Sequence, residues 1–85
     1  MNEGPISGVK VHEHGVLLLD FDSGNSLVLD MKPTFGAFRF GVLANPEIFA
    51  TADTDGNFIH WYRDGMMVAE LGFGEIMKMV FGEAY

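Results

Sequence analysis

The sequence predicts a small α+β domain with a three-stranded antiparallel meander, a second hairpin and one or two short helices, the last of them C-terminal. The prediction has three sources. Apolar residues alternate with polar ones in residues 9–31, an Asp-Gly pair separates two short extended runs, and apolar residues recur three and four apart near the end. With 85 residues and no cysteine, we expect a single domain over residues 1–85 that folds without disulfides.

The alternation in residues 9–31 predicts a strand register. Suppose that Glu13-His14-Gly15 and Asp22-Ser23-Gly24 are three-residue hairpin loops, each ending in a left-handed glycine. One face of the meander then carries Val9, Val11, Leu17, Leu19, Leu27 and Leu29. A slip by one residue at either loop would mix polar residues into this set, so the register is well specified.

The other face of the meander is mixed rather than polar. It carries Val16, Leu18 and Val28 among Lys10, His12, Asp20 and Asp30. Three clustered apolar side chains on a polar face indicate that a later segment or another subunit partly covers it.

The middle of the chain is punctuated by proline and glycine. Lys32-Pro33 ends the third strand, because proline cannot donate to a ladder, and residues 35–41 are too rich in glycine for a regular element. Asn45 as cap and Pro46 at the first helical position predict a helix of one turn.

A second hairpin is expected around Asp55-Gly56, with residues 49–53 and 57–61 as its strands. This register places Ala52 opposite Ile59 and Ala50 opposite Trp61. A helix from about Phe73 or Gly74 to Phe81 follows, ended by Gly82, with one face made of Phe73, Ile76, Met77 and Val80.

Charge and composition exclude several partners. Five Lys and Arg against twelve Asp and Glu give a net charge of −7, and the cations are scattered, so we expect no direct binding of nucleic acid. An unbroken apolar stretch such as residues 16–19 is far too short to span a bilayer, and no membrane partner is expected. The absence of cysteine and of a signal-like start predicts a cytoplasmic location.

Motifs for metal binding and catalysis are incomplete. His12 and His14 lie two apart, but the register puts His14 in a loop and no third ligand is evident, so we expect no metal. The Asp-rich segments 20–25 and 53–57 are typical of hairpin turns rather than of calcium loops. Gly72-Phe73-Gly74 lacks the rest of a phosphate loop, and no serine has an activating neighbour. We therefore predict no cofactor, no catalytic residue and no enzyme activity.

Two sets of residues remain as candidate binding sites. Trp61, Tyr62, Arg63 and Phe38 could line an aromatic cleft for a small ligand, although in a short chain such residues more often form the core. An interaction surface is the other candidate, because a domain of this size has little interior for its methionine-rich end. It comprises Val16, Leu18, Val28, Met77, Met79 and Phe81.

The ordered pattern of strands, turns and core residues from about residue 5 to residue 71 resembles the bacterial domain of unknown function 2442. It consists of Ile6, Leu19-Asp20-Phe21 with Gly24, Val28-Leu29-Asp30 before Pro33, Leu43, Pro46, Phe49, Ile59, Trp61, Gly65 and Leu71. Tyr62 departs from it, since a proline is expected after the tryptophan, and the tail beyond Leu71 is not explained by it. The resemblance implies a small α+β domain of unknown activity, sometimes found before a helix-turn-helix module, with some members suggested to be antitoxin-like partners of a small protein.

These observations lead to two hypotheses of function. The first is a non-catalytic cytosolic protein-interaction module, antitoxin-like or self-associating as a homo-oligomer. The alternative is a small-ligand binding domain with an aromatic cleft around Trp61.

Overall fold

The alternating segment forms an antiparallel sheet in the predicted register. In the computed structural model, which describes residues 4–81, this sheet consists of β1 (Ile6–Glu13), β2 (Val16–Phe21) and β3 (Ser26–Asp30) in that order. Val11 pairs with Leu17, Leu17 with Leu29, and Leu19 with Leu27, as the apolar pattern requires. Gly24 takes a positive φ of 93° in the second loop, as predicted.

The first loop is tighter than predicted. Glu13 still pairs with Val16, so the turn itself is His14-Gly15, and an irregularity between Val11 and Glu13 absorbs the extra residue. Gly15 takes a positive φ of 93°, and a Cβ there would collide with the Lys32 side chain. The register of the sheet is unaffected, because the bulge restores it within two residues.

The segment after β3 contains short helical turns. They are η1 (Lys32–Thr34), η2 (Gly41–Ala44) and α1 (Pro46–Phe49). The prediction for α1 is confirmed, since the Asn45 side chain accepts a hydrogen bond from the Glu47 N–H and Pro46 begins the helix.

The second sheet differs from the predicted hairpin in two ways. Its strands are β4 (Asp53–Thr54), β5 (Phe58–Arg63) and β6 (Met66–Gly72). Phe49 belongs to α1, so only two residues remain for β4, and Thr54 rather than Ala52 pairs with Ile59. The predicted pairing of Ala50 with Trp61 is wrong for the same reason.

The cause of the shift is the Asp55 side chain. Its carboxylate accepts hydrogen bonds from the N–H groups of Asn57 and Phe58, both at 2.9 Å, and the turn therefore centres on Gly56-Asn57. Gly56 has a φ of 106°. These bonds also lower the pKa of Asp55 below its ordinary value, because they favour the charged form.

The methionine-rich segment after Gly65 is a strand, which the sequence analysis did not predict. It continues without a loop into α2 (Phe73–Phe81), whose predicted bounds are confirmed. Gly82, the predicted stop, lies outside the described residues.

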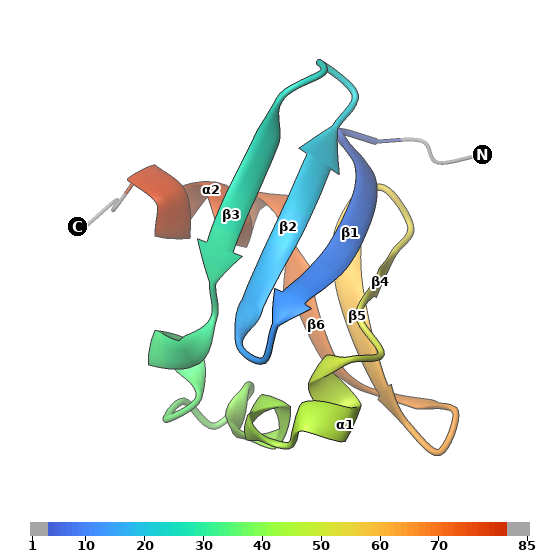
Figure 1. Cartoon of the computed structure of the whole chain (residues 1–85), viewed down its shortest axis with the longest axis vertical. Helices are drawn as coiled ribbons and strands as arrows, with labels where there is room; N and C mark the ends of the chain where they lie inside the picture. Colours follow the sequence, from blue (N-terminus) through green and yellow to red (C-terminus); the bar gives the residue numbers. More distant parts are fainter. Residues whose placement is uncertain (1–3, 82–85) are drawn as a thin grey trace.

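The two sheets stack on a shared core, as Figure 1 shows, with β5 and β6 behind β1 and β2. The sheets meet where the Ile6 N–H donates to the Gly56 carbonyl at 2.9 Å. The predicted α+β class, with its last helix C-terminal, is confirmed. The largest fully buried side chains come from both sheets, the segment between them and α2: Ile6, Leu17, Leu19, Met31, Leu43, Phe49, Ile59, Trp61, Leu71 and Ile76.

Candidate functional site

The structure does not assemble the predicted aromatic cleft. Trp61 is fully buried and stacks on Phe49 with ring centroids 6.1 Å apart, so it serves the core. Tyr62 and Arg63 border a shallow hollow with α1, whereas the fully exposed Phe38 borders a different one beside β6. Burial of the tryptophan thus separates the residues that the sequence placed together.

His12 and His14 have different surroundings and do not form a pair. His14 Nε2 lies 3.1 Å from the Leu43 carbonyl, and its ring stacks on Phe35, which ties the turn to the segment before α1. His12 is exposed on β1. Within residues 4–81, no three His, Asp or Glu side chains are placed to hold a metal ion.

The predicted interaction surface divides between the sheet and α2. Val16 is buried, which corrects its place in that surface: the chain returns there after β3, and the Met31 N–H donates to the Gly15 carbonyl at 2.7 Å. Leu18 is half-buried, while Val28 stays 63% exposed. On α2, Met77 and Met79 are half-buried against the core and Phe81 is 73% exposed.

Val28 and Met79 meet at a hollow between β3 and the end of α2, which we call the β3–α2 groove. Its volume is about 530 Å³. It is lined by Leu27, Val28, Leu29, Asp30, Pro33, Thr34, Met79 and Val80. A neighbouring hollow of about 510 Å³, bordered by Met77 and Phe81, shares Leu27 and Val80 with it. An apolar depression therefore follows α2 along the edge of the first sheet.

Figure 1 shows why this depression exists: α2 passes behind β3 and extends beyond it, past the edge of the sheet. Among the described residues β3 pairs only with β2. The helix thus carries apolar side chains to a place where no strand of the described part of the chain covers them.

The backbone of β3 also has groups that point to this open edge. The Phe21 N–H donates to Asn25 and the Met31 N–H to Gly15, so the odd-numbered residues of β3 make the bonds to β2. Because hydrogen-bonded and non-bonded pairs alternate along an antiparallel ladder, the N–H and C=O groups of Ser26, Val28 and Asp30 point outward.

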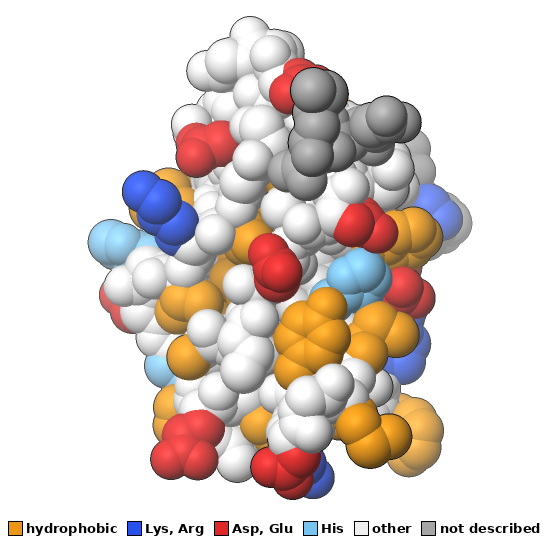
Figure 2. All heavy atoms as spheres, turned by 90° about the vertical axis from the view of Figure 1, so that its right-hand side faces the viewer, with side chains coloured by type: hydrophobic (Ala, Val, Ile, Leu, Met, Phe, Trp, Pro, Cys, Tyr) orange, Lys and Arg blue, Asp and Glu red, His pale blue; other side chains and the backbone are white. Residues whose placement is uncertain are grey.

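The charges along this edge are paired within the chain. The Asp30 carboxylate accepts from the Lys32 N–H at 3.0 Å and lies 3.6 Å from its Nζ, while the Ser26 hydroxyl donates to Asp20 at 2.8 Å. On the side of the molecule seen in Figure 2, Asp and Glu side chains are spread singly. At the groove, the carboxylate of Asp30 is therefore already bonded to Lys32.

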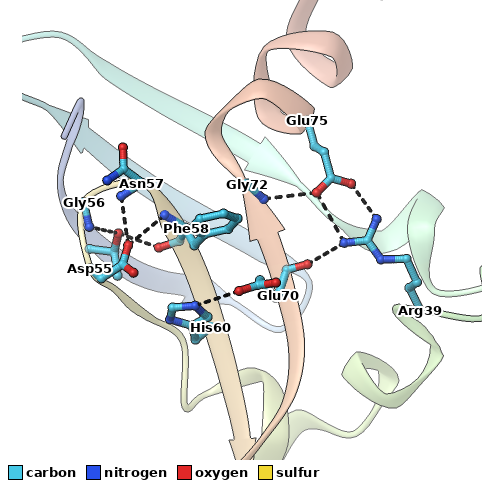
Figure 3. Close-up of polar contacts among 10 residues, drawn as sticks. Arg39, Asp55, Gly56, Asn57, Phe58, His60, Glu70, Gly72 and Glu75 are labelled. Atoms are coloured by element: carbon cyan, nitrogen blue, oxygen red, sulfur yellow. Dashed lines mark hydrogen bonds and ion pairs between the residues drawn. The ribbon is translucent and has the colours of Figure 1, made fainter.

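A different arrangement occupies the open edge of β6, shown in Figure 3. Arg39 donates to the Glu70 carbonyl at 2.7 Å and to the Glu75 carboxylate at 2.5 Å, and that carboxylate accepts from the Gly72 N–H at 3.2 Å. We call Arg39 and Glu75 with these two backbone groups the β6 clasp. The mutual bond lowers the pKa of Glu75 and raises that of Arg39.

Sequence reasoning missed β6 and the clasp. The signal for the strand was present, since Asp64-Gly65 is a two-residue turn between extended runs, and both residues have positive φ. The clasp joins residues 31 and 36 positions apart, for which the sequence carries no local signal.

No family model matches the sequence, and neither a curated protein nor a solved structure does. The likeness to the domain of unknown function 2442 stays a prediction. In the described part of the chain, no helix has the length and apolar character to cross a bilayer.

Proposed function

We propose that this chain is a non-catalytic protein-interaction module that works by self-association, with the β3–α2 groove as its contact surface. The observation that supports it best is the apolar groove of about 530 Å³ that lies beside a strand edge with no partner among residues 4–81. An unpaired edge offers a row of backbone donors and acceptors, and natural proteins usually protect such edges. Here it is left beside uncovered apolar side chains of the last helix.

A second copy is the partner that the groove suits. Its lining contains one charged residue, Asp30, whose carboxylate is already bonded to Lys32, so a basic partner would find little charge to pair with. An apolar, uncharged segment fits better, and β3 itself is such a segment over Leu27, Val28 and Leu29. The role as an antitoxin-like partner has no comparable observation in its favour.

Size-exclusion chromatography with light scattering on the full chain tests the proposal. We expect a mass twice the 9.4 kDa of the chain at micromolar concentrations and above. Val80→Asp should shift the equilibrium to monomer, because it places a charge in the groove at a side chain that is 40% exposed. Met66→Asp is the matched control, since it adds the same charge to an exposed residue outside the groove, and should leave the dimer intact.

Two outcomes would overturn the proposal. One is a mass of 9.4 kDa at every concentration up to the millimolar range. The other is a dimer that Met66→Asp dissociates as strongly as Val80→Asp, because the contact would then lie elsewhere.

Small-ligand binding is a second candidate, carried by the hollow of about 510 Å³ beside Met77 and Phe81, a size typical of ligand pockets. It replaces the cleft expected around Trp61. The chemical shift of the Met77 methyl group, measured in the presence of apolar small molecules, would test it. The candidate fails if none of the compounds tested changes that chemical shift.

A further inference from the structure

The open edge of β3 is self-complementary in one register. We propose that two copies join by antiparallel pairing of β3 with β3, with Val28 on the two-fold axis, to form one continuous sheet across the dimer. This inference rests on the proposed self-association and names its geometry.

The outward-pointing backbone groups restrict the possible registers. Ser26, Val28 and Asp30 are the residues whose N–H and C=O groups face the edge, so each must lie opposite one of these same three residues in the second copy. Only with Val28 opposite itself does the whole strand, Ser26–Asp30, overlap with its copy. A two-fold interface is reciprocal: if residue 26 of one copy lies opposite residue 30 of the other, then residue 30 of the first copy lies opposite residue 26 of the second.

Charge and side-chain type favour the same register. It places Ser26 opposite Asp30 of the second copy, whereas the register centred on Asp30 would place two carboxylates face to face. Val28, which is 63% exposed on the outer face, would lie beside its own copy as an apolar cross-strand pair. Pairing therefore covers the most exposed large apolar side chain of the first sheet without opposing like charges.

The pairing would also cover α2. An added strand at the edge of β3 lies over the part of α2 that extends past the sheet (Figure 1), where Met79 and Val80 line the groove. The inner-face residue Leu27 of the second copy, which is half-buried in its own chain, would then contact these side chains, because alternate residues of a strand face opposite sides. One contact thus fills the groove and completes the edge.

Disulfide trapping tests the register. Because the sequence contains no native cysteine, any disulfide that forms must involve the introduced residues. Paired residues of an antiparallel sheet have Cα atoms about 5.5 Å apart, within the range of roughly 4.4–6.8 Å that a disulfide accepts. Val28→Cys should form a disulfide-linked dimer at least about tenfold faster than Lys10→Cys, an exposed residue of β1 on the same face.

A mixture of two single variants provides the second arm, at exposed positions that do not threaten the fold. Ser26→Cys mixed with Asp30→Cys should give the mixed disulfide in preference to either homodimer, because in this register residue 26 lies opposite residue 30 and neither lies opposite itself. Circular dichroism of each variant would verify that it is folded.

The results separate this inference from the proposed function. If Val80→Asp dissociates the dimer and Met66→Asp does not, but Val28→Cys crosslinks no faster than Lys10→Cys, the register is wrong and self-association through the groove stands. Preferential homodimers of Ser26→Cys would also overturn the register. A wild-type chain that is monomeric in light scattering overturns both.

Discussion

Two edge strands of this molecule, β3 and β6, are alike in topology and different in chemistry. Strand β3 ends the first sheet and β6 ends the second, and each has one neighbouring strand among the described residues. On β6 the outward carbonyl of Glu70 and the outward N–H of Gly72 are bonded by the side chains of Arg39 and Glu75. On β3, within residues 4–81, no side chain is bonded to the outward groups of Val28, and an apolar groove lies next to them.

The difference shows that side chains distant in sequence, and not the position of a strand in its sheet, decide whether the outward backbone groups of an edge strand are bonded. Arg39 reaches β6 from the segment between η1 and η2, far from the strand in sequence. Natural proteins protect edges in this way against pairing with other chains. An edge that lacks the protection is therefore a candidate interface.

The largest effect is expected from Val28→Pro. The N–H of Val28 points away from β2, so proline removes no bond within the sheet but removes the donor at the centre of the interface. Loss of two reciprocal hydrogen bonds at about 1 kcal/mol each should weaken the dimer roughly 30-fold. Analytical ultracentrifugation would measure it.

Phe38→Ser is the control for Val28→Pro, because Phe38 is fully exposed beside the clasped strand. It should change the dimer affinity by less than about threefold. Equal weakening by both substitutions would mean that the contact does not distinguish the two edges.

Removal of the clasp is expected to have the next largest effect. Arg39→Ala eliminates the bonds to Glu75 and to the Glu70 carbonyl, and we expect a loss of about 1 kcal/mol in the free energy of unfolding, since both partners are largely exposed. It also opens β6, so species heavier than a dimer should appear at high concentration. Arg39→Lys keeps the charge without the planar fork and should show both effects more weakly. Light scattering that finds only dimers for Arg39→Ala would contradict the protective role of the clasp.

Acid should weaken the clasp in a defined range of pH. The bond to Arg39 holds the pKa of Glu75 below its ordinary value of 4.5. Its contribution to stability is therefore present above about pH 4.5 and is lost as the pH falls through the lowered pKa of the folded state. In urea unfolding, the stability advantage of the wild type over Glu75→Gln should be constant near neutral pH and shrink below about pH 4.5. An advantage that does not change between pH 7 and pH 3 would contradict this account.

Salt should have the smallest effect, and it should favour the dimer. Each copy carries a net charge of −7, and screening reduces the repulsion between two such chains. An increase from low to moderate ionic strength should tighten the dimer by a few-fold, as measured by sedimentation. A dimer that salt dissociates would instead be held by ion pairs between copies.

Local patterns in the sequence predicted the first sheet and both helices. Alternation in residues 9–31 specifies the register because a slip would bury Lys10 or Asp30, and Asn45 with Pro46 marks the start of α1. The second hairpin was predicted in the wrong register, because the carboxylate of Asp55 moves the turn by one residue.

The candidate site was predicted only in part. Val28, Met77, Met79 and Phe81 do border the depression along α2, whereas Val16 and Trp61 are buried. Whether an apolar side chain on a strand is covered depends on segments that return from elsewhere in the chain, as the residues after β3 do at Val16. Such contacts have no signature in residue type or spacing.

Amide hydrogen exchange measured at several protein concentrations tests the contrast between the two edges most directly. The amides of Val28 on β3 and Glu70 on β6 both point away from their neighbouring strands. We predict that protection of the Val28 amide rises with concentration as β3 pairs with a second copy, while that of Glu70 stays constant. A Val28 amide that exchanges equally fast at every concentration would contradict the account.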